Sequence, residues 1–165
     1  VQDDTMFNES FATAVERLGG QRWLQEQGSE AARREYAQYD QRRTQFRALT
    51  LATRKKLEAI YQTNGPAGQQ ILTQAAMKKG AMQEFRGNYE ALKTQWQGYA
   101  GYDPWVARAN NASFGALAAY DELVPQFEAL FAKQGSWQKF YDGCKALAAL
   151  PRAERRAALA AQAAP

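Results

Sequence analysis

The stretch SEAARREYAQYDQRRTQFRALTLATRKKLEAIYQTNGP, residues Ser29–Pro66, decides the fold class of this chain. Ser29 can cap a long helix that runs to about Gln62, and Asn64-Gly65-Pro66 would end it, because Gly permits a left-handed cap and Pro cannot continue the hydrogen-bond ladder. Apolar side chains recur at three- and four-residue steps and predict one buried face, made by Tyr36, Tyr39, Phe46, Leu57 and Ile60. Polar residues interrupt this face, so we expect its middle to be weakly packed or to contact something else: Arg43, Thr50 and Thr53.

A second long helix is expected directly after the turn, from about Ala67 to Tyr99. Its apolar residues keep the same alternation: Ala75, Met82, Phe85, Tyr89, Leu92, Trp96 and Tyr99. Two such helices joined by a tight turn should pair as an antiparallel hairpin over residues 29–100, with packing like that of a coiled coil.

The segments on either side of this hairpin also have helical patterns. We expect a helix from Thr5 to Leu18 that Gly19–Gly20 stops, and then a short second helix in QRWLQEQG, residues 21–28. GYAGYDPW, residues 98–105, should form the main loop. Three further features complete the prediction: a helix to about Lys133 that Pro125 kinks or splits, a helix capped by Ser136, and a last helix that starts at Pro151. The sequence therefore predicts an all-α protein, a single helical domain over residues 1–165.

The composition excludes several kinds of site. The chain has no His and one Cys, so it cannot by itself supply a histidine general base or a His-ligated metal site. No calcium-binding loop and no phosphate-binding Gly-rich loop is present, and no run of about 18 apolar residues could span a membrane. Cys144 lies on a predicted helix, where we expect a small buried thiol.

The charge of the chain gives little reason to expect a nucleic-acid partner. The net charge is +4, and the basic residues gather in the first long helix, where acids and the paired helix can neutralise them. No nucleic-acid-binding motif accompanies them. We therefore expect no nucleic-acid binding, and we keep a helical protein-interaction module, docking through the hairpin, as the alternative function.

One short motif points to chemistry. In NESFATAVE, residues 8–16, Glu9 and Glu16 are two helical turns apart and so share a helix face. The motif resembles the N-E-G-F-A-x-x-x-x-E pattern of zinc aminopeptidases in the thermolysin-like superfamily, with Ser10 in place of Gly. The longer stretch DDTMFNESFATAVERLG strongly resembles the segment that follows H-E-L-A-H-Q in a bacterial family of predicted aminopeptidases. Three later stretches also resemble that family: NNASFGALAAYDELVPQF, FYDGCKAL and LPRAERRAAL.

The resemblance implies a role for three residues of this motif. In the family an H-E-x-x-H helix, which supplies two zinc ligands and the general base, would come shortly before Val1, so this chain would be the C-terminal part of the enzyme. Glu9 would be the third zinc ligand, Asn8 would contact the substrate backbone or fix the start of its helix, and Glu16 would steady a zinc-bound His. As alternatives, Glu9 is a first-turn acid favoured by the helix dipole and Glu16 belongs to a solvated face.

Further residues and properties follow from the same resemblance. Tyr120 could donate its phenol to a transition-state oxyanion, or it is simply a core or half-buried tyrosine. Asn110 and Asn111 could contact substrate, or they cap the next helix. The intact protein would use zinc and a peptide substrate, and would lie in the bacterial cell envelope or periplasm. The fragment alone, without the rest of the protein, is expected to bind no zinc and to be inactive.

Overall fold

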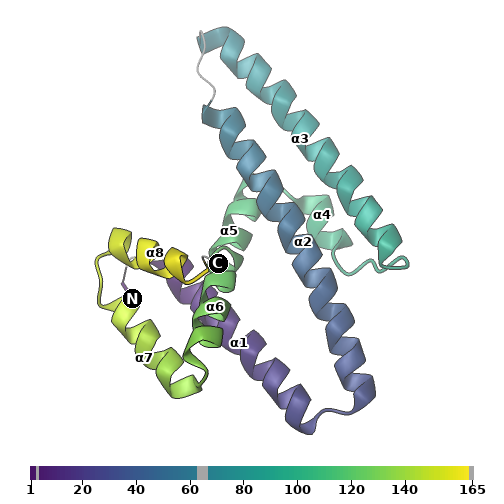
Figure 1. Cartoon of the computed structure of the whole chain (residues 1–165). Helices are drawn as coiled ribbons and strands as arrows, with labels where there is room; N and C mark the ends of the chain where they lie inside the picture. The colour runs from purple at the N-terminus through teal and green to yellow at the C-terminus, as the bar shows by residue number, and fades with distance from the viewer. Residues whose placement is uncertain (3, 63–66, 164–165) are drawn as a thin grey trace. The chain divides into compact units, whose positions relative to one another are not determined.

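The computed structural model describes residues 1–2, 4–62 and 67–163, and within these ranges it contains helices and no strand. This confirms the prediction of an all-α fold. Figure 1 shows the elements in chain order, which are α1 (Thr5–Gln27), α2 (Glu30–Gln62), α3 (Ala67–Gln95), α4 (Asp103–Arg108), α5 (Asn111–Asp121), α6 (Val124–Gln134), α7 (Trp137–Ala148), α8 (Arg152–Ala160) and the short 3-10 helix η1 (Ala161–Ala163).

The chain divides into two compact units. Unit 1 combines Val1–Glu30 with Ala119–Pro165, and unit 2 is the continuous stretch Ala31–Ala118. Helix α5 runs across the boundary between them. Each unit has its own hydrophobic core, and each is described by itself below.

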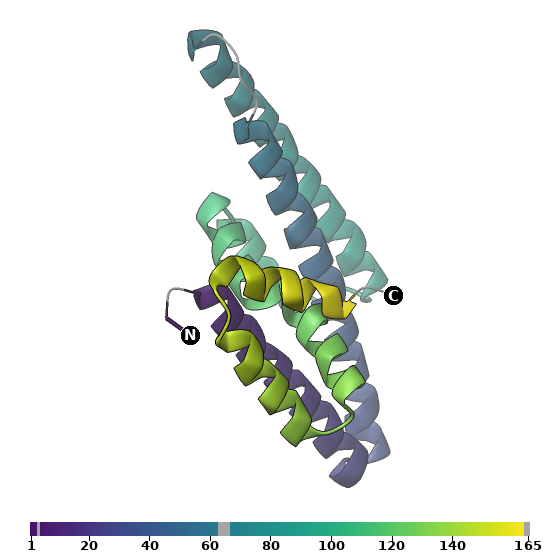
Figure 2. The same cartoon turned by 60° about the vertical axis from the view of Figure 1, so that its left-hand side comes forward.

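Unit 2 is built on α2 and α3, which lie side by side in both views (Figures 1 and 2). At the middle of α2, Gln45 accepts a hydrogen bond of 2.6 Å from the Trp96 indole, which follows the end of α3. Near the end of α2, the carbonyl oxygen of Ile60 accepts one of 3.3 Å from Gln74, near the start of α3. Because the order of the partners reverses, the two helices are antiparallel.

Aromatic side chains fill the core of unit 2. The Phe46 ring stacks on Tyr102 with 4.0 Å between centroids, and Trp105 meets Phe46 edge-on at 5.3 Å. Phe85 of α3 contacts Phe114 of α5 at 5.0 Å. Helices α4 and α5 therefore add their own rings to the face shared by α2 and α3, which makes this unit a four-helix core rather than a bare hairpin.

Of the two alternatives for the middle of α2, weak packing or contact with something else, weak packing is wrong at Thr50 and Thr53. Thr50 and Thr53 are buried in the unit, and their hydroxyls donate to the backbone carbonyls of Arg47 and Leu49 at 2.9 and 2.8 Å. The helix backbone thus satisfies both hydroxyls, which leaves their methyl groups free to pack like apolar side chains.

Unit 1 packs α1, α7 and α8 around α6. The ring of Phe127 lies at its centre and meets Phe7 and Phe11 edge-on at 5.1 and 5.7 Å. The other buried members of this core are Ala14, Leu123, Val124, Leu130, Phe140, Cys144, Leu147 and Leu159. This confirms that Cys144 is a buried thiol.

Two predicted boundaries are wrong. Gly19–Gly20 does not end the first helix, because α1 continues to Gln27 and the cap lies at Gly28, whose N–H donates to the Leu24 carbonyl. A glycine permits a left-handed cap but does not require one, and in a helix interior it costs only about 1 kcal/mol. The predicted loop over residues 98–105 also contains the start of α4, because Pro104 occupies its first turn, where a missing N–H costs no hydrogen bond.

Other local predictions are confirmed. Pro125 separates α5 from α6 and lies in the first turn of α6, and the Ser136 hydroxyl caps α7 by accepting from Lys139 N–H. The predicted stop at Asn64-Gly65-Pro66 lies outside the described residues. In the part of the chain that the structure describes, none of the helices has the length and apolar character needed to cross a membrane.

Candidate functional site

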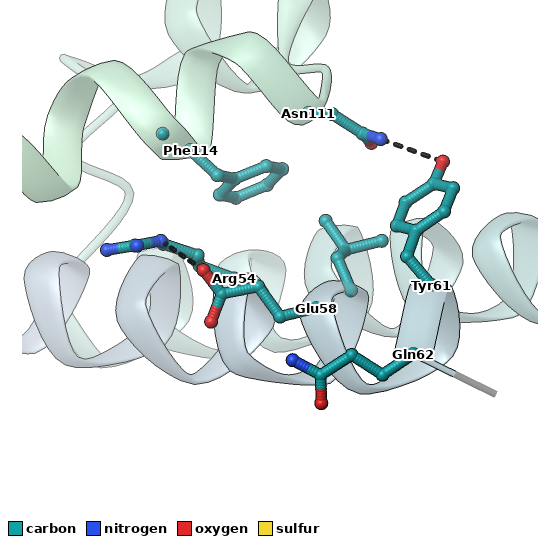
Figure 3. Close-up of a pocket in the computed structure, with 8 residues that line it drawn as sticks. Arg54, Glu58, Tyr61, Gln62, Asn111 and Phe114 are labelled. Carbon is teal, nitrogen blue, oxygen red and sulfur yellow. Dashed lines mark hydrogen bonds and ion pairs between the residues drawn. The ribbon is translucent and has the colours of Figure 1, made fainter.

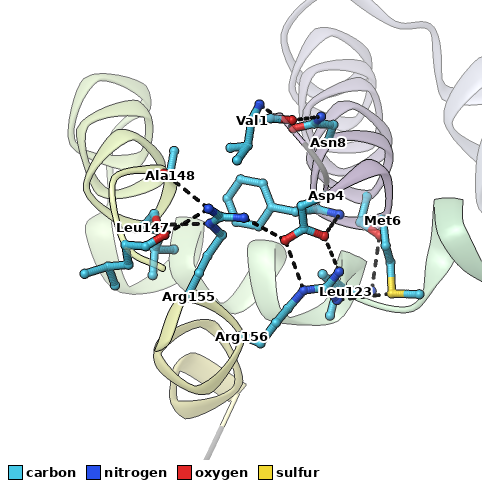
Figure 4. A network of polar contacts seen from close by, with 12 residues as sticks. Val1, Asp4, Met6, Asn8, Leu123, Leu147, Ala148, Arg155 and Arg156 are labelled. Atoms are coloured by element: carbon cyan, nitrogen blue, oxygen red, sulfur yellow. Dashed lines mark hydrogen bonds and ion pairs between the residues drawn. The ribbon is translucent and has the colours of Figure 1, made fainter. Parts of the chain in front are cut away.

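The start of α1 is held by a buried charged network. Asp4 is only 2% exposed, and its carboxylate caps the helix by accepting from Phe7 N–H at 3.3 Å. The same carboxylate accepts a hydrogen bond of 2.8 Å from Arg155 and is bound by the guanidinium of Arg156 (Figure 4). A charge this deeply buried is stable only when paired, and Asp4 has two cationic partners.

The charge state of Asp4 follows from these contacts. Burial by itself would raise the pKa of the carboxyl group, but hydrogen bonds from Arg156, Arg155 and the Phe7 N–H, together with the positive charge of Arg156, outweigh it. The pKa of Asp4 therefore lies below its usual value, and the group is ionised at neutral pH.

Arg155 connects this cap to a second helix end. Besides Asp4, its guanidinium donates to three carbonyl oxygens at the end of α7 and just beyond it. These belong to Leu147 at 3.3 Å, Ala148 at 3.4 Å and Leu150 at 2.9 Å. A cation at a helix C-terminus is favourable because the last carbonyls have no partner within the helix. One side chain of α8 thus fixes the first turn of α1 against the last turn of α7, and so sets the position of the motif residues that follow Asp4.

Ser10 occupies the position that is Gly in the N-E-G-F-A-x-x-x-x-E pattern, and in the structure it makes a buried hydrogen bond. Its side chain is fully buried, and its hydroxyl accepts a hydrogen bond of 3.3 Å from the N–H of Leu123, at the start of α6. Ser10 therefore joins the motif helix to the corner between α5 and α6.

Asn8 binds a backbone. Its Nδ2 donates to the carbonyl oxygen of Val1 at 2.7 Å, and its Oδ1 accepts from the amino-terminal ammonium of Val1 at 2.9 Å (Figure 4). A carboxamide can make this pair of bonds with any extended residue, since each residue offers one N–H and one carbonyl.

Glu9 and Glu16 lie on the side of α1 away from its buried residues, Phe7, Ser10, Ala14 and Arg17. Glu9 is half-buried and Glu16 is exposed. Among the described residues, neither carboxylate has a hydrogen bond or an ion pair. Glu9 is thus available to one cation as a single ligand.

The described residues do not form a complete metal site around Glu9. Within residues 1–2, 4–62 and 67–163, no three acidic or thiol side chains come together as metal ligands. Zinc sites in proteins use three or four protein ligands. Glu9 therefore fits zinc as one ligand, and the residues that the structure describes do not fit it as a whole site.

An apolar groove of about 400 Å³ lies beside Asn8 in unit 1. Phe7 and Phe11 of α1 and Tyr141, Cys144 and Ala148 of α7 form its apolar lining, and Asn8, Gln138 and Lys145 add polar groups. Burial raises the pKa of the Cys144 thiol to about 12, so the group stays protonated at neutral pH and is a poor nucleophile. The groove can therefore bind an apolar group next to a carboxamide, without covalent chemistry.

The remaining predicted residues lie elsewhere. Tyr120, in unit 1, is 49% exposed and, in the described part of the chain, makes no hydrogen bond or ring contact. Asn110 belongs to unit 2 and caps α5, since its Oδ1 accepts from the N–H groups of Ala112 and Ser113 at 2.9 and 3.2 Å. The capping alternative for Asn110 is therefore confirmed.

Asn111 also belongs to unit 2 and lines a pocket between α2 and α5 (Figure 3). Its Nδ2 donates to the Tyr61 hydroxyl at 2.8 Å. Of the six predicted residues, then, the structure brings Asn8, Glu9 and Glu16 together on α1, and it places Asn110 and Asn111 in the other unit.

Sequence reasoning missed the network of Asp4, Arg155 and Arg156. One signal was present: Arg155 lies one helical turn before Leu159, on the same face as this fully buried residue. A charged residue on the buried face of a short helix indicates a buried partner.

Comparisons with known proteins agree with the motifs. Neither a curated protein nor a solved structure matches the chain. The family described as Putative aminopeptidase matches residues 1–159, nearly the whole sequence. The chain belongs to this aminopeptidase family.

Proposed function

We propose that the intact protein is a zinc-dependent aminopeptidase and that this chain supplies Glu9 as the third zinc ligand. Membership of the aminopeptidase family supports a peptidase function. The observation that carries the assignment to Glu9 is its carboxylate, which has no partner among the described residues although it follows a rigidly anchored helix start. A ligand held in this way would need little reorganisation to bind a metal.

The other two zinc ligands in this proposal are His residues of an H-E-x-x-H helix that precedes this sequence in the intact protein, which would also supply the general base. When bound, zinc would polarise a water molecule and the peptide carbonyl for hydrolysis. One carboxylate does not hold zinc usefully, so the chain alone would be inactive. We infer a location in the bacterial cell envelope or periplasm from the family resemblance.

The neighbours of Glu9 have positioning roles in this proposal. Asn8 would hydrogen-bond the N–H and carbonyl of an extended substrate residue, and its bond to the Val1 carbonyl supports this use of its amide. The groove beside it would take an apolar side chain of the peptide. Glu16 would accept a hydrogen bond from a zinc-bound His and so fix its ring, and Tyr120 would donate its phenol to the oxyanion.

The experiment is to express the intact protein and to compare wild type with Glu9→Gln, Glu16→Gln and Glu26→Gln. Glu26 lies on the same helix and pairs with Arg22, so its variant is a control of equal charge. We expect Glu9→Gln to lose bound zinc and hydrolysis, Glu16→Gln to bind zinc about 10–100-fold more weakly, and Glu26→Gln to match wild type. Zinc content is measured by elemental analysis, and hydrolysis with free and N-acetylated peptides.

Two results would refute the proposal. A wild-type protein without zinc would refute the metallopeptidase function, and full zinc occupancy in Glu9→Gln would refute the ligand assignment. Cleavage of the N-acetylated peptide at the same rate as the free peptide would indicate an endopeptidase instead of an aminopeptidase.

A second candidate, a helical protein-interaction module, is favoured by one observation. On α3, Ile71 and Leu72 are 67% and 75% exposed, which is unusual for two adjacent large apolar side chains. In this alternative the α2–α3 hairpin would dock on another protein through these residues. Chemical cross-linking in cells of wild type and an Ile71→Ser, Leu72→Ser variant tests it, since a loss of specific adducts with unchanged hydrolysis would separate docking from catalysis.

A further inference from the structure

The pocket between α2 and α5 has the features of a ligand site that is independent of Glu9. It lies wholly within unit 2 and has a volume of about 400 Å³ (Figure 3). Leu57 and Phe114, both buried core residues, provide apolar surface, and Tyr61 and Asn111 stand together on one side. Apolar walls with a few polar groups are typical of small-molecule sites.

Asn111 has an unsatisfied amide at this pocket. Its Nδ2 donates to the Tyr61 hydroxyl at 2.8 Å, whereas its Oδ1 is shielded from solvent and has no hydrogen-bond partner among the described residues. If the amide is turned over, Oδ1 can accept from Tyr61, but Nδ2 is then left without an acceptor. Either orientation therefore leaves one half of the amide unsatisfied, which is uncommon for a shielded polar group.

These alternatives narrow the class of ligand. A group with an N–H donor and a carbonyl acceptor side by side can satisfy the free half of Asn111 in either orientation, and an amide is such a group. The last side-chain torsion of Asn111 is broad, so its amide can turn to meet such a group.

The charges at the pocket argue for a neutral ligand. Arg54 and Glu58 pair with each other across one helical turn, with 2.9 Å between Arg54 Nε and Glu58 Oε1. Their charges largely cancel, so the pocket offers no unbalanced charge to a carboxylate or an ammonium group.

Gly115 forms part of the pocket wall. A Cβ placed on Gly115 would have no heavy atom within 4 Å, so a larger side chain there would extend into free space without a clash. Gly115 also lines the pocket, so a larger side chain at this position would stand at the pocket wall.

We propose that this pocket binds a neutral amide that carries an apolar group, the chemistry of one peptide unit with an apolar side chain. The amide pairs with Asn111 and Tyr61, and the apolar group lies on Leu57 and Phe114. The proposal does not depend on zinc or on the assignment of Glu9.

The test is an NMR titration of the metal-free full chain with 3-phenylpropanamide and, separately, with the corresponding methyl ester, methyl 3-phenylpropanoate. The ester has the same apolar group and a carbonyl but no N–H. We expect the amide to shift the backbone signals of Tyr61, Asn111, Phe114 and Gly115. It should bind about tenfold more tightly than the ester, because Asn111 Nδ2 is already used by Tyr61 and the free Oδ1 can accept from the amide N–H but finds no donor in the ester.

Three variants sharpen the test. Gly115→Leu should abolish binding by filling the pocket, and Asn111→Leu should weaken amide binding about tenfold with little effect on the ester. Asn88→Leu, the same change at an exposed position of α3, should bind like wild type. Circular dichroism checks that each variant is folded.

Several outcomes would overturn the proposal: equal binding of amide and ester, unchanged binding in Gly115→Leu, or no shifts up to the solubility limit of the amide. Because no metal is present and no hydrolysis is measured, these outcomes leave the peptidase proposal untouched. A failed zinc experiment, conversely, would leave this site standing.

Discussion

The two units place their carboxylates in contrasting surroundings. In unit 1, Asp4 is 2% exposed and is paired with two guanidinium groups. In unit 2, Asp103 accepts from the Tyr89 hydroxyl and binds Lys93 at 2.7 Å, but its side chain is 42% exposed. Each acid holds the start of a helix, α1 or α4, yet one is sealed inside a core and the other is open to water.

This difference separates what a charged contact contributes from what its loss costs. A solvent-exposed pair contributes little, because water stabilises the separated charges almost as well. A buried pair also contributes little in total, but removal of one partner is severe, because the remaining charge stays in a poorly solvated place. The anchor of the Glu9 helix should therefore be far more sensitive to mutation than the anchor of α4.

The largest effect is expected for Asp4→Ala. It leaves Arg155 and Arg156 without their carboxylate, and we expect the free energy of unfolding to fall by about 3–5 kcal/mol. Amide hydrogen exchange, read separately in the two units, should show the loss first in α1, α7 and α8, the helices that the network joins. Asp103→Ala is the matched variant in unit 2 and should have a much smaller effect. Equal losses from both variants would contradict the contrast between the two acids.

Acidification should reproduce part of this effect. The folded state lowers the pKa of Asp4, so its stabilisation is complete above the unfolded pKa, near 3.8, and is lost as the pH falls through the lower folded pKa. We expect unfolding free energies measured between pH 5 and pH 2 to fall with pH more steeply in wild type than in Asp4→Asn. Asp103, whose pKa is also lowered by Lys93 and Tyr89, contributes to both curves and so does not affect the comparison. Parallel curves would show that Asp4 is not the responsible group.

The fold was predictable where local signals decide it. The cap at Ser136 and the break at Pro125 depend on neighbouring residues only, and both are as predicted. The pairing of Asp4 with Arg155 joins residues 151 positions apart, so no local pattern reveals it.

The candidate site also has features that the local sequence predicts and contacts that it does not. The spacing of Glu9 and Glu16 is local and places both on one side of α1, as the sequence indicates. The contact of Ser10 with Leu123 depends on how α1 packs on the corner between α5 and α6, which the sequence does not encode in any short pattern. The roles of Asn8, Glu9, Glu16 and Tyr120 in catalysis remain predictions.

A smaller effect is expected for Ser10→Ala. The change leaves the buried N–H of Leu123 without this acceptor, which costs about 1–3 kcal/mol. Thr53→Val is the matched change in unit 2. It should cost less, because the hydroxyl that it removes donates to a helix carbonyl that already accepts a backbone hydrogen bond. Urea unfolding of both variants measures the difference, and a larger loss for Thr53→Val would contradict it.

The smallest predicted effect is that of Gly19→Ala, which tests whether α1 is continuous. The sign of the change in unfolding free energy distinguishes a continuous helix from one that ends at Gly19. An added Cβ at Gly19 meets no heavy atom within 4 Å, and Gly19 lies inside α1, so Gly19→Ala should raise the unfolding free energy by about 0.5–1 kcal/mol. Gly87→Ala in α3 is the counterpart in unit 2 and should behave alike, since its Cβ is equally unobstructed. If Gly19 instead ended a helix in a left-handed conformation, alanine would be strained there and would lower the stability, while Gly87→Ala would still raise it. Opposite signs for the two variants would therefore show that α1 stops at Gly19, and equal signs would support the single long helix that carries Asn8 and Glu9.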